Sequence, residues 1–264
     1  MSDVKKILWT GGWDSTFRVL YLVLVEKCPV QTYYIIDPLR WSLVHEFKAM
    51  SNIKSLLKQR YPELSPLLLP TLYFDKTDVG ENLHLSACYE GLKERLGGQY
   101  EWLSIWADQF GLSEIELVIE RSDSVVGCRS VIANYLSKDE KGYCVIDAKH
   151  KCTPVYDLFH YFVFAITDIY KVDMRRIAAE NNFSDILNLS WFCHRPTFFS
   201  KPCGTCNPCK NTYVKGLCDR LGLYGNFMYK LNHLLSIKNY FEKDSRIYSM
   251  LKYVKNFFAR MNNL

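Results

Sequence analysis

Four cysteines lie close together in the last third of the sequence, at a spacing that is typical of metal ligands. They are Cys193, Cys203, Cys206 and Cys209. The last three form C-x2-C-x2-C, and Gly204 and Pro208 suit the turns between thiolates that bind one tetrahedral zinc ion. The spacing therefore predicts a closed, structural zinc site. An iron–sulfur cluster is the alternative, although the ferredoxin run has a further cysteine followed by proline, and here Lys210 follows Cys209.

A glycine turn near the N-terminus carries residue types that bind phosphate. It reads Thr10-Gly11-Gly12-Trp13-Asp14-Ser15-Thr16. Two glycines let the backbone approach an anion closely, and the N–H groups that open a helix attract phosphate. The hydroxyls of Thr10, Ser15 and Thr16 could donate to the same anion. The turn is neither a Walker A loop nor G-x-G-x-x-G. The alternative is an ordinary turn in which Asp14 or Ser15 is the N-cap.

Strands alternate with helices over the first two thirds of the chain. We expect strands at 6–10, 30–36, 67–74 and 115–119. We expect helices from residue 14 and at 43–60, 100–110, 155–167 and 172–182. This alternation predicts an α/β fold with a parallel sheet flanked by helices. An open sheet of this kind binds ligands beyond the carboxyl ends of its strands, where the glycine turn lies.

The chain is expected to contain two domains. Residues 1–185 would form a nucleotide-binding α/β domain, and residues 186–264 would form the zinc knuckle and a helical C-terminal part. Within the first domain, the stretch 121–153 is polar and irregular, with a loop tip at 138–142.

The glycine turn resembles the pyrophosphate loop, Ser-Gly-Gly-x-Asp-Ser, of the ATP pyrophosphatase superfamily, with Thr10 in place of the first serine. Together with the cysteine cluster it makes residues 5–217 similar to the 7-cyano-7-deazaguanine synthase family. Asp37 and Arg40 after the second strand, Lys171, and Ser190-Trp191-Phe192-Cys193 match further family segments. The arginine–asparagine pair of that family has no counterpart around residues 99–102. The resemblance implies a Rossmann-like fold of the adenine nucleotide alpha-hydrolase type.

The resemblance also implies an activity. The family uses ATP to activate 7-carboxy-7-deazaguanine as an adenylate, releases pyrophosphate, and forms the amide and then the nitrile with ammonia. It implies Mg²⁺ and Zn²⁺, with catalytic roles for Asp14, Ser15 and Lys171. The residues implied to bind the nucleotide are Thr10, Gly11, Gly12, Asp14, Ser15, Thr16, Asp37 and Arg40. The alternatives are that Lys171 is a solvated lysine and that Asp14 only caps a helix.

Other functions stay open at this point. A defence-associated relative would join the activated deazaguanine to an amine of a protein. A tRNA-modifying member of the superfamily is a further alternative, and a binding module without turnover is another. The basic and aromatic segment from Lys238 to Arg260 could contact RNA or protein, although such a stretch is more often a helix docked on the body of the protein.

Composition limits these possibilities only weakly. The chain has 264 residues, 48% of them hydrophobic, and an excess of five positive charges. Such a charge tolerates a nucleic-acid partner without requiring one, and nucleic acid is the less favoured expectation. The sequence shows neither a long apolar stretch nor the apolar core of a signal peptide. We therefore expect a cytoplasmic protein without a membrane partner, and we also expect a homodimer.

Overall fold

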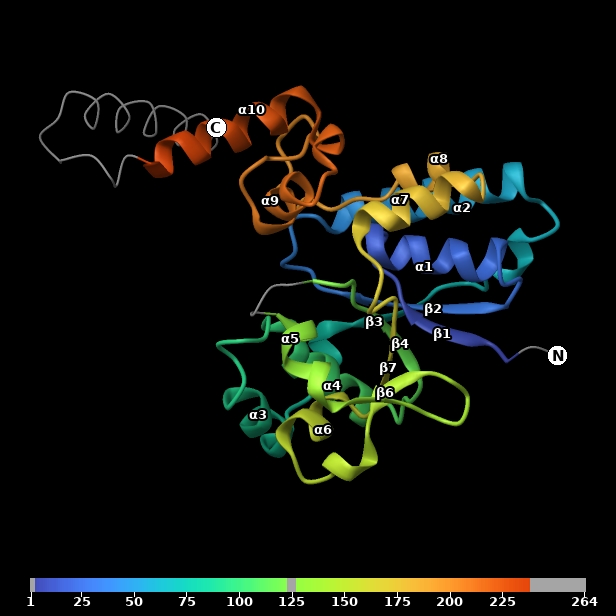
Figure 1. The fold of residues 1–264 in the computed structure, drawn as a ribbon, viewed down its shortest axis with the longest axis vertical. Coiled ribbons are helices and arrows are strands. Elements are labelled where there is room, and N and C mark those ends of the chain that lie inside the picture. Colours follow the sequence, from blue (N-terminus) through green and yellow to red (C-terminus); the bar gives the residue numbers. More distant parts are fainter. Residues whose placement is uncertain (1–2, 123–126, 238–264) are drawn as a thin grey trace, which may run out of the picture. The chain divides into compact units, whose positions relative to one another are not determined.

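The computed structural model describes residues 3–122 and 127–237, which Figure 1 shows as a coloured ribbon. The chain divides into two compact units, residues 1–191 and 192–264. The strands of the first unit are β1 (Lys5–Leu8), β2 (Val30–Ile36), β3 (Leu72–Asp75), β4 (Ile115–Val118), β5 (Leu136–Lys138), β6 (Cys144–Ile146) and β7 (Phe162–Ala165). Its helices are α1 (Trp13–Leu24), α2 (Leu43–Arg60), α3 (Leu83–Glu90), α4 (Gln99–Gln109), α5 (Cys128–Ile132), α6 (Pro154–Phe159), α7 (Lys171–Glu180) and α8 (Ser184–Asn188).

The seven strands in the described ranges form one sheet in the order β3-β2-β1-β4-β7-β6-β5. The first five of these run parallel, while β6 pairs antiparallel to β7 and β5 antiparallel to β6. The predicted α/β fold with a parallel sheet is therefore confirmed for the body of the sheet. The order of the strands reverses between β1 and β4. A crevice at the carboxyl ends of these two strands is where sheets of this kind bind ligands.

Helices cover both faces of the sheet (Figure 1). On one face α1 contacts α7 and α8, and α2 contacts α8; on the other face α3 and α4 both contact α6. Each face buries large apolar side chains. Phe17 of α1 and Ile53 of α2 are at most 1% exposed, as are Trp106 of α4 and Phe159 of α6. The apolar spacing of α1 thus buries one stripe of the helix and fixes where its N-terminus lies.

One predicted helix is wrong in its second half. The expected helix 155–167 is α6 (Pro154–Phe159) followed by β7 (Phe162–Ala165). Residues 162–164 are all buried, because β7 lies inside the sheet with helices over it. A short apolar run of this kind has no periodicity that separates a strand from a helix. The parallel pairing with β4 makes residues 162–165 a strand.

The third strand begins later than predicted. The expected strand 67–74 is β3 (Leu72–Asp75), with a 3-10 turn at Ser65–Leu67 before it. Pro70 lies between the two, and proline cannot donate a ladder hydrogen bond. β3 lies at the edge of the sheet, since it pairs only with β2 among the described strands.

The irregular stretch 121–153 contains the β5–β6 hairpin. Its turn is the predicted loop tip, where the Asp139 carboxylate accepts hydrogen bonds from the backbone N–H groups of Lys141 and Tyr143. In the second unit the described helices are α9 (Asn207–Val214) and α10 (Gly222–Ile237). The segment from Lys238 to Arg260 lies outside the described residues.

Within the described ranges, no helix combines the length and the apolar character that crossing a membrane would require.

Candidate functional site

The glycine turn leaves the carboxyl end of β1 in a backbone conformation that glycine alone adopts without strain. Gly11 has φ +68°, and a Cβ at this position would lie 3.0 Å from Cγ of Met50 and 3.1 Å from the carbonyl oxygen of Glu46. The turn therefore passes close against α2. The backbone N–H of Trp191 donates to the Gly11 carbonyl at 2.8 Å, which ties the turn to the end of the first unit.

The N-terminus of α1 follows the turn directly. Gly12 is its N-cap, and no side chain caps the helix. The N–H of Thr16 makes the first helical bond, to the Gly12 carbonyl at 2.9 Å. The alternative in which Asp14 or Ser15 caps the helix is therefore wrong. Without a side-chain cap, the positive end of the helix dipole and the first-turn N–H groups face the carboxyl edge of the sheet, where they could bind an anion.

Three charged side chains meet at this edge from the ends of three strands. Lys171 opens α7 after β7, Asp14 lies in the first turn of α1 after β1, and Glu120 follows β4. The Lys171 ammonium contacts both carboxylate oxygens of Asp14, with Oδ2 at 2.6 Å, and lies 3.3 Å from Oε1 of Glu120. Asp14 and Lys171 were predicted from the sequence as site residues, whereas Glu120 was not.

Lys171 keeps its charge in spite of its burial. Its side chain is only 10% exposed. Burial by itself would lower the pKa of the Lys171 ammonium, but attraction from Asp14 and then from Glu120 outweighs it, so that the pKa lies above the ordinary value. The alternative of a solvated lysine is therefore wrong. A buried ammonium between two carboxylates can bind a phosphate oxygen when a ligand enters.

The hydroxyl groups of the turn differ in their surroundings. Ser15 is 9% exposed, and its Oγ lies 3.5 Å from the Gly12 carbonyl. Thr16 is fully buried, and its hydroxyl accepts a hydrogen bond from the indole N–H of Trp9 at 3.0 Å. Thr10 lies beside the turn, 3.3 Å from the position that a Cβ on Gly12 would take. Thr10 and Ser15 thus line the turn, whereas Thr16 holds the helix against β1.

Asp37 and Arg40 follow β2, which is the neighbour of β1. The Asp37 carboxylate accepts from Lys76 Nζ at 2.8 Å and from the N–H of Leu39 at 3.1 Å. Arg40 lies 3.3 Å from a carboxylate oxygen of Glu46. Burial by itself would raise the pKa of Asp37. The hydrogen bonds from Lys76 and Leu39 act in the opposite direction, and the pKa of Asp37 lies below its ordinary value. Asp37 and Arg40 therefore form ion pairs of their own, with Lys76 and Glu46, separate from the group of Asp14 and Lys171.

Glu46 connects this second segment to the glycine turn. Its carboxylate is buried and accepts hydrogen bonds from Tyr34 Oη at 2.8 Å and Ser42 Oγ at 2.6 Å as well as from Arg40. Burial, and then the charge of Glu46, raise the pKa of Tyr34. The backbone of the same residue contacts Gly11, so one residue of α2 holds both segments.

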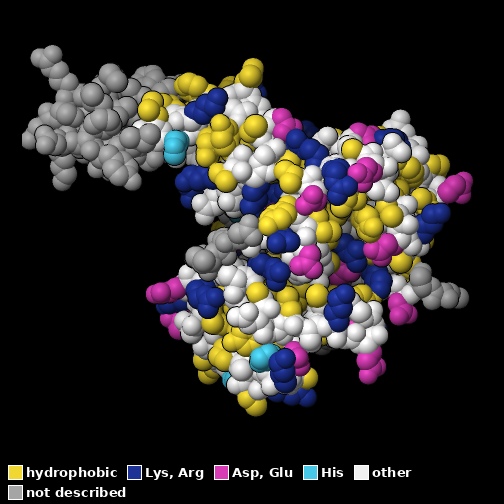
Figure 2. Space-filling view, in the orientation of Figure 1, with side chains coloured by type: hydrophobic (Ala, Val, Ile, Leu, Met, Phe, Trp, Pro, Cys, Tyr) yellow, Lys and Arg dark blue, Asp and Glu magenta, His cyan; other side chains and the backbone are white. Residues whose placement is uncertain are grey.

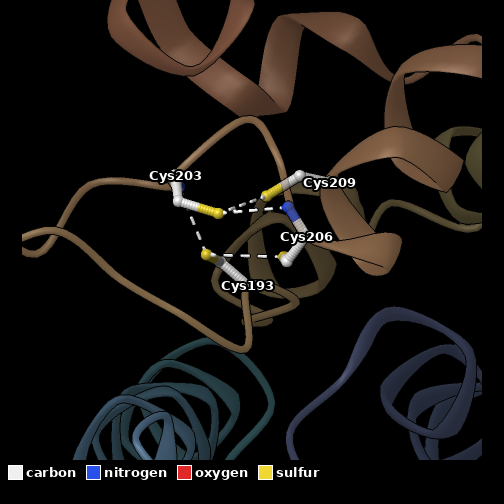
Figure 3. A group of neighbouring side chains, drawn as sticks. All are labelled: Cys193, Cys203, Cys206 and Cys209. Carbon is white, nitrogen blue, oxygen red and sulfur yellow. Dashed lines mark hydrogen bonds between the residues drawn. The ribbon is translucent and has the colours of Figure 1, made fainter. Parts of the chain in front are cut away.

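The four predicted metal ligands converge in the second unit (Figure 3). The sulfur atoms of Cys203 and Cys209 lie 3.9 Å apart, as do those of Cys193 and Cys206, and all four lie within 4.8 Å of one another. Tetrahedral zinc with Zn–S bonds of about 2.3 Å requires sulfur separations of about 3.8 Å. The cluster could therefore hold a single metal ion such as zinc.

Backbone N–H groups surround the sulfur atoms in the way that thiolates require. Those of Thr205 and Cys206 point at Cys203 Sγ at 3.4 and 3.3 Å, and that of Cys203 points at Cys193 Sγ at 3.2 Å. Hydrogen bonds, first of all from Cys193, lower the pKa of Cys203. Gly204 has φ +75°, and a Cβ there would lie 2.2 Å from the carbonyl oxygen of Gly225. Only glycine fits this turn.

The chemistry of both sites follows from their own residues. Comparison of the chain with protein-family models gives no match, and comparison with curated proteins gives none. The carboxyl edge of the sheet combines a helix N-terminus, a buried ammonium and two carboxylates, which suits an anionic ligand together with a cation. The cysteine cluster offers four thiols, which would fill the four positions of a tetrahedral ion and thus suit a structural metal.

Proposed function

We propose that this protein is an ATP-dependent enzyme that activates a carboxylic acid as its adenylate and transfers the acyl group to an amine. The observation that carries the proposal is the meeting of Lys171 with Asp14 and Glu120 beside the uncapped N-terminus of α1. A cation and a helix N-terminus at the switch point of a parallel sheet suit a nucleotide triphosphate. The pyrophosphate-loop resemblance of residues 10–16 agrees with this placement.

The reaction has two steps in this account. A carboxylate oxygen of the acid attacks the α-phosphorus of ATP, and the bond between the α-phosphorus and the bridging oxygen breaks, so that its electrons leave with pyrophosphate. The amine nitrogen then attacks the acyl carbon and gives up a proton to solvent, and AMP leaves with the electrons of the acyl–oxygen bond. In the family that the chain resembles, the acid is 7-carboxy-7-deazaguanine, and a second ATP-driven step dehydrates the amide to the nitrile.

Each residue at the carboxyl edge has a role in these steps. The first-turn N–H groups of α1 and the hydroxyls of Thr10 and Ser15 hold the phosphates that leave as pyrophosphate. Lys171 stabilises the negative charge that grows on the α-phosphoryl oxygens. Asp14 and Glu120 provide the hard oxygen donors that Mg²⁺ prefers, and the ion would neutralise charge on the triphosphate.

The amine acceptor is the part of the reaction with least support from the residues. The family's arginine–asparagine pair has no counterpart in residues 99–102, which lie at the start of α4. We propose ammonia as the first acceptor to test, because it is the nitrogen donor of the family that the chain resembles, with a protein amine as the alternative. Rapid release of pyrophosphate with little amide or nitrile would favour the larger acceptor.

The test is to incubate the protein with ATP, Mg²⁺, 7-carboxy-7-deazaguanine and ammonia, and to identify the products by mass spectrometry. AMP, pyrophosphate and the amide or nitrile are expected. Asp14→Ala and Ser15→Ala should abolish AMP formation in folded protein, while Ser113→Ala, at an exposed position before β4, should leave it unchanged. ADP and phosphate as products would refute the proposal.

A second candidate is the same activation chemistry directed at a tRNA, and the distribution of charge favours it. Residues 192–264 contain 12 lysines and arginines and 3 acidic residues, whereas residues 1–191 contain 21 and 25. The net charge is therefore +9 for residues 192–264 and −4 for residues 1–191, and the two sum to the +5 of the whole chain. Figure 2 shows basic side chains among hydrophobic ones on the described part of the second unit.

Exposed aromatic side chains accompany these charges. Phe198 and Phe199 are 94% and 78% exposed, and Arg195 and Lys201 flank them in exposed positions. Aromatic rings next to cationic groups stack on the bases of single-stranded nucleic acid. The candidate predicts salt-sensitive binding of tRNA, measured by fluorescence anisotropy, that weakens at least tenfold in Phe198→Ala/Phe199→Ala. Binding that is unchanged in this variant would exclude it.

A further inference from the structure

Three metal-ligating side chains meet on the opposite face of the sheet from α1, apart from both sites above. His84 and Cys88 belong to α3, and Asp157 belongs to α6. His84 and Cys88 are four residues apart, so they lie on the same face of their helix, one turn from each other. α3 contacts α6, and this packing brings Asp157 to both of them.

The distances within this group match those between the ligands of one zinc ion. His84 Nε2 lies 3.0 Å from Asp157 Oδ2 and 3.8 Å from Cys88 Sγ, and Cys88 Sγ lies 3.7 Å from Asp157 Oδ2. Tetrahedral zinc with bonds of about 2.0 Å to nitrogen and oxygen and about 2.3 Å to sulfur spaces such ligands by about 3.3–3.6 Å. Shifts of a few tenths of an ångström would satisfy the ion.

The two helices that carry the ligands are held in place independently of any metal. Asn82 caps α3, since its Oδ1 accepts from the N–H of Leu85 at 3.1 Å, and its Nδ2 donates to Asp108 of α4 at 3.0 Å. Ser104 of α4 donates to the Leu158 carbonyl of α6 at 2.7 Å. The backbone that presents the three side chains is therefore organised before an ion binds, which lowers the cost of binding.

Exposure is graded across the group. Cys88 is 8% exposed, the Asp157 side chain 25% and the His84 side chain 71%. An ion held by all three would lie at the surface, with its fourth coordination position toward water. One thiolate, one carboxylate and one neutral imidazole supply two negative charges and the nitrogen, oxygen and sulfur donors that zinc takes.

We propose that His84, Cys88 and Asp157 form a second zinc site, which has three protein ligands and a water molecule in the fourth position. The site is independent of the cysteine cluster and of the proposed activation chemistry, because it shares no residue with either. Three protein ligands and an open position distinguish it from the closed four-cysteine site.

The experiment measures zinc bound per chain by the full-length protein, equilibrated with zinc at free concentrations set by a chelating buffer. Wild type should bind two ions and His84→Gln one. The His84 side chain is mostly exposed, so this variant should keep its fold, which circular dichroism checks. His160→Gln, at an exposed histidine of the same region, is the matched control and should bind two.

Cobalt substitution identifies the ligands. Cobalt bound at the second site should give a thiolate-to-metal absorption band that Cys88→Ser removes, while the stronger absorption of the four-cysteine site stays. One zinc ion in wild type with an intact cysteine cluster would overturn the proposal. Two ions in His84→Gln would overturn it as well, because histidine would then not be a ligand.

Discussion

The ammonium nitrogen of Lys171 lies 2.6 Å from Oδ2 of Asp14, although 157 positions separate the two residues in the sequence. The sheet explains the contact, because Asp14 follows β1 and Lys171 follows β7, and β4 lies between these strands. Glu120, which follows β4, completes the group from the middle strand. A buried cation is thus placed beside the glycine turn by the carboxyl ends of three parallel strands.

Removing the buried cation should destabilise the protein through its two carboxylates. In Lys171→Met, Asp14 and Glu120 would lose the positive charge of the buried ammonium that both contact, and we expect the free energy of unfolding to fall by about 3 kcal/mol. Adding Asp14→Asn should recover part of this loss, which denaturant titration of the single and double variants measures. Lys149→Met, at a lysine that is 68% exposed, is the control and should change little. Strictly additive effects would show that Lys171 and Asp14 are not coupled.

The effect on stability of the close approach between α2 and the glycine turn can be separated from the effect of backbone strain by comparing two alanine variants. Gly11→Ala meets both a φ of +68° and the contacts with Met50 and Glu46, whereas Gly111→Ala meets a φ of +58° in open space. We expect Gly11→Ala to lower the unfolding free energy by about 1–3 kcal/mol more than Gly111→Ala does. Equal losses of unfolding free energy in the two variants would mean that α2 can move away from the added methyl group without destabilising the protein.

The cysteine cluster should couple metal binding to the stability of the second unit. Cys206→Ser leaves three thiolates, so we expect loss of the metal ion of the cluster and a lower melting temperature, and a strong chelator should do the same to wild type. Cys218→Ser, at an exposed cysteine outside the cluster, should keep both properties. Metal content and thermal unfolding are measured together. A colourless zinc protein is expected, and stoichiometric iron with sulfide would contradict the zinc assignment.

Asp37 should make stability depend on pH in the acid range. Burial would raise its pKa, but the hydrogen bonds from Lys76 and Leu39 together with the charges of Lys76 and Arg40 outweigh burial, so that the pKa in the folded protein lies below the ordinary 3.8. The unfolded chain therefore binds this proton more readily, and the stabilisation is complete above pH 3.8 and lost as the pH falls toward the folded value. The difference in unfolding free energy between wild type and Asp37→Asn should shrink over this range. A difference that stays constant with pH would contradict the pairing of Asp37 with Lys76. A pH dependence of the same size in the Lys76→Met background would contradict it as well.

Sequence reasoning found the residues whose types are rare and whose spacing is local. The four cysteines lie within a short stretch, residues 193–209, and the turn from Thr10 to Thr16 is one continuous run. The structure brings the cysteines together as predicted. Sequence reasoning missed Glu120, because a single glutamate after a strand has no local signature. Its position after the predicted strand 115–119, next to the reversal in strand order, is the signal that could have identified it.

The wrong helix at 155–167 has a related cause. Residues 162–165 lack alternation because both faces of β7 are buried, and only the pairing with β4 makes them a strand. The His84–Cys88–Asp157 group was also beyond sequence reasoning, since 69 residues separate Cys88 from Asp157 and helix packing alone joins them. Local sequence patterns predicted local structure, whereas the long-range contacts could be identified only from the three-dimensional fold.

The central claim, formation of an acyl adenylate, is tested most directly by following oxygen from the acid to AMP. 7-Carboxy-7-deazaguanine labelled with ¹⁸O in its carboxylate is incubated with the protein, ATP, Mg²⁺ and an amine, and AMP is examined by mass spectrometry. Attack of the carboxylate on the α-phosphorus, followed by cleavage of the acyl–oxygen bond, predicts one ¹⁸O atom in each AMP formed. Unlabelled AMP, or label in inorganic phosphate alongside ADP, would contradict the account.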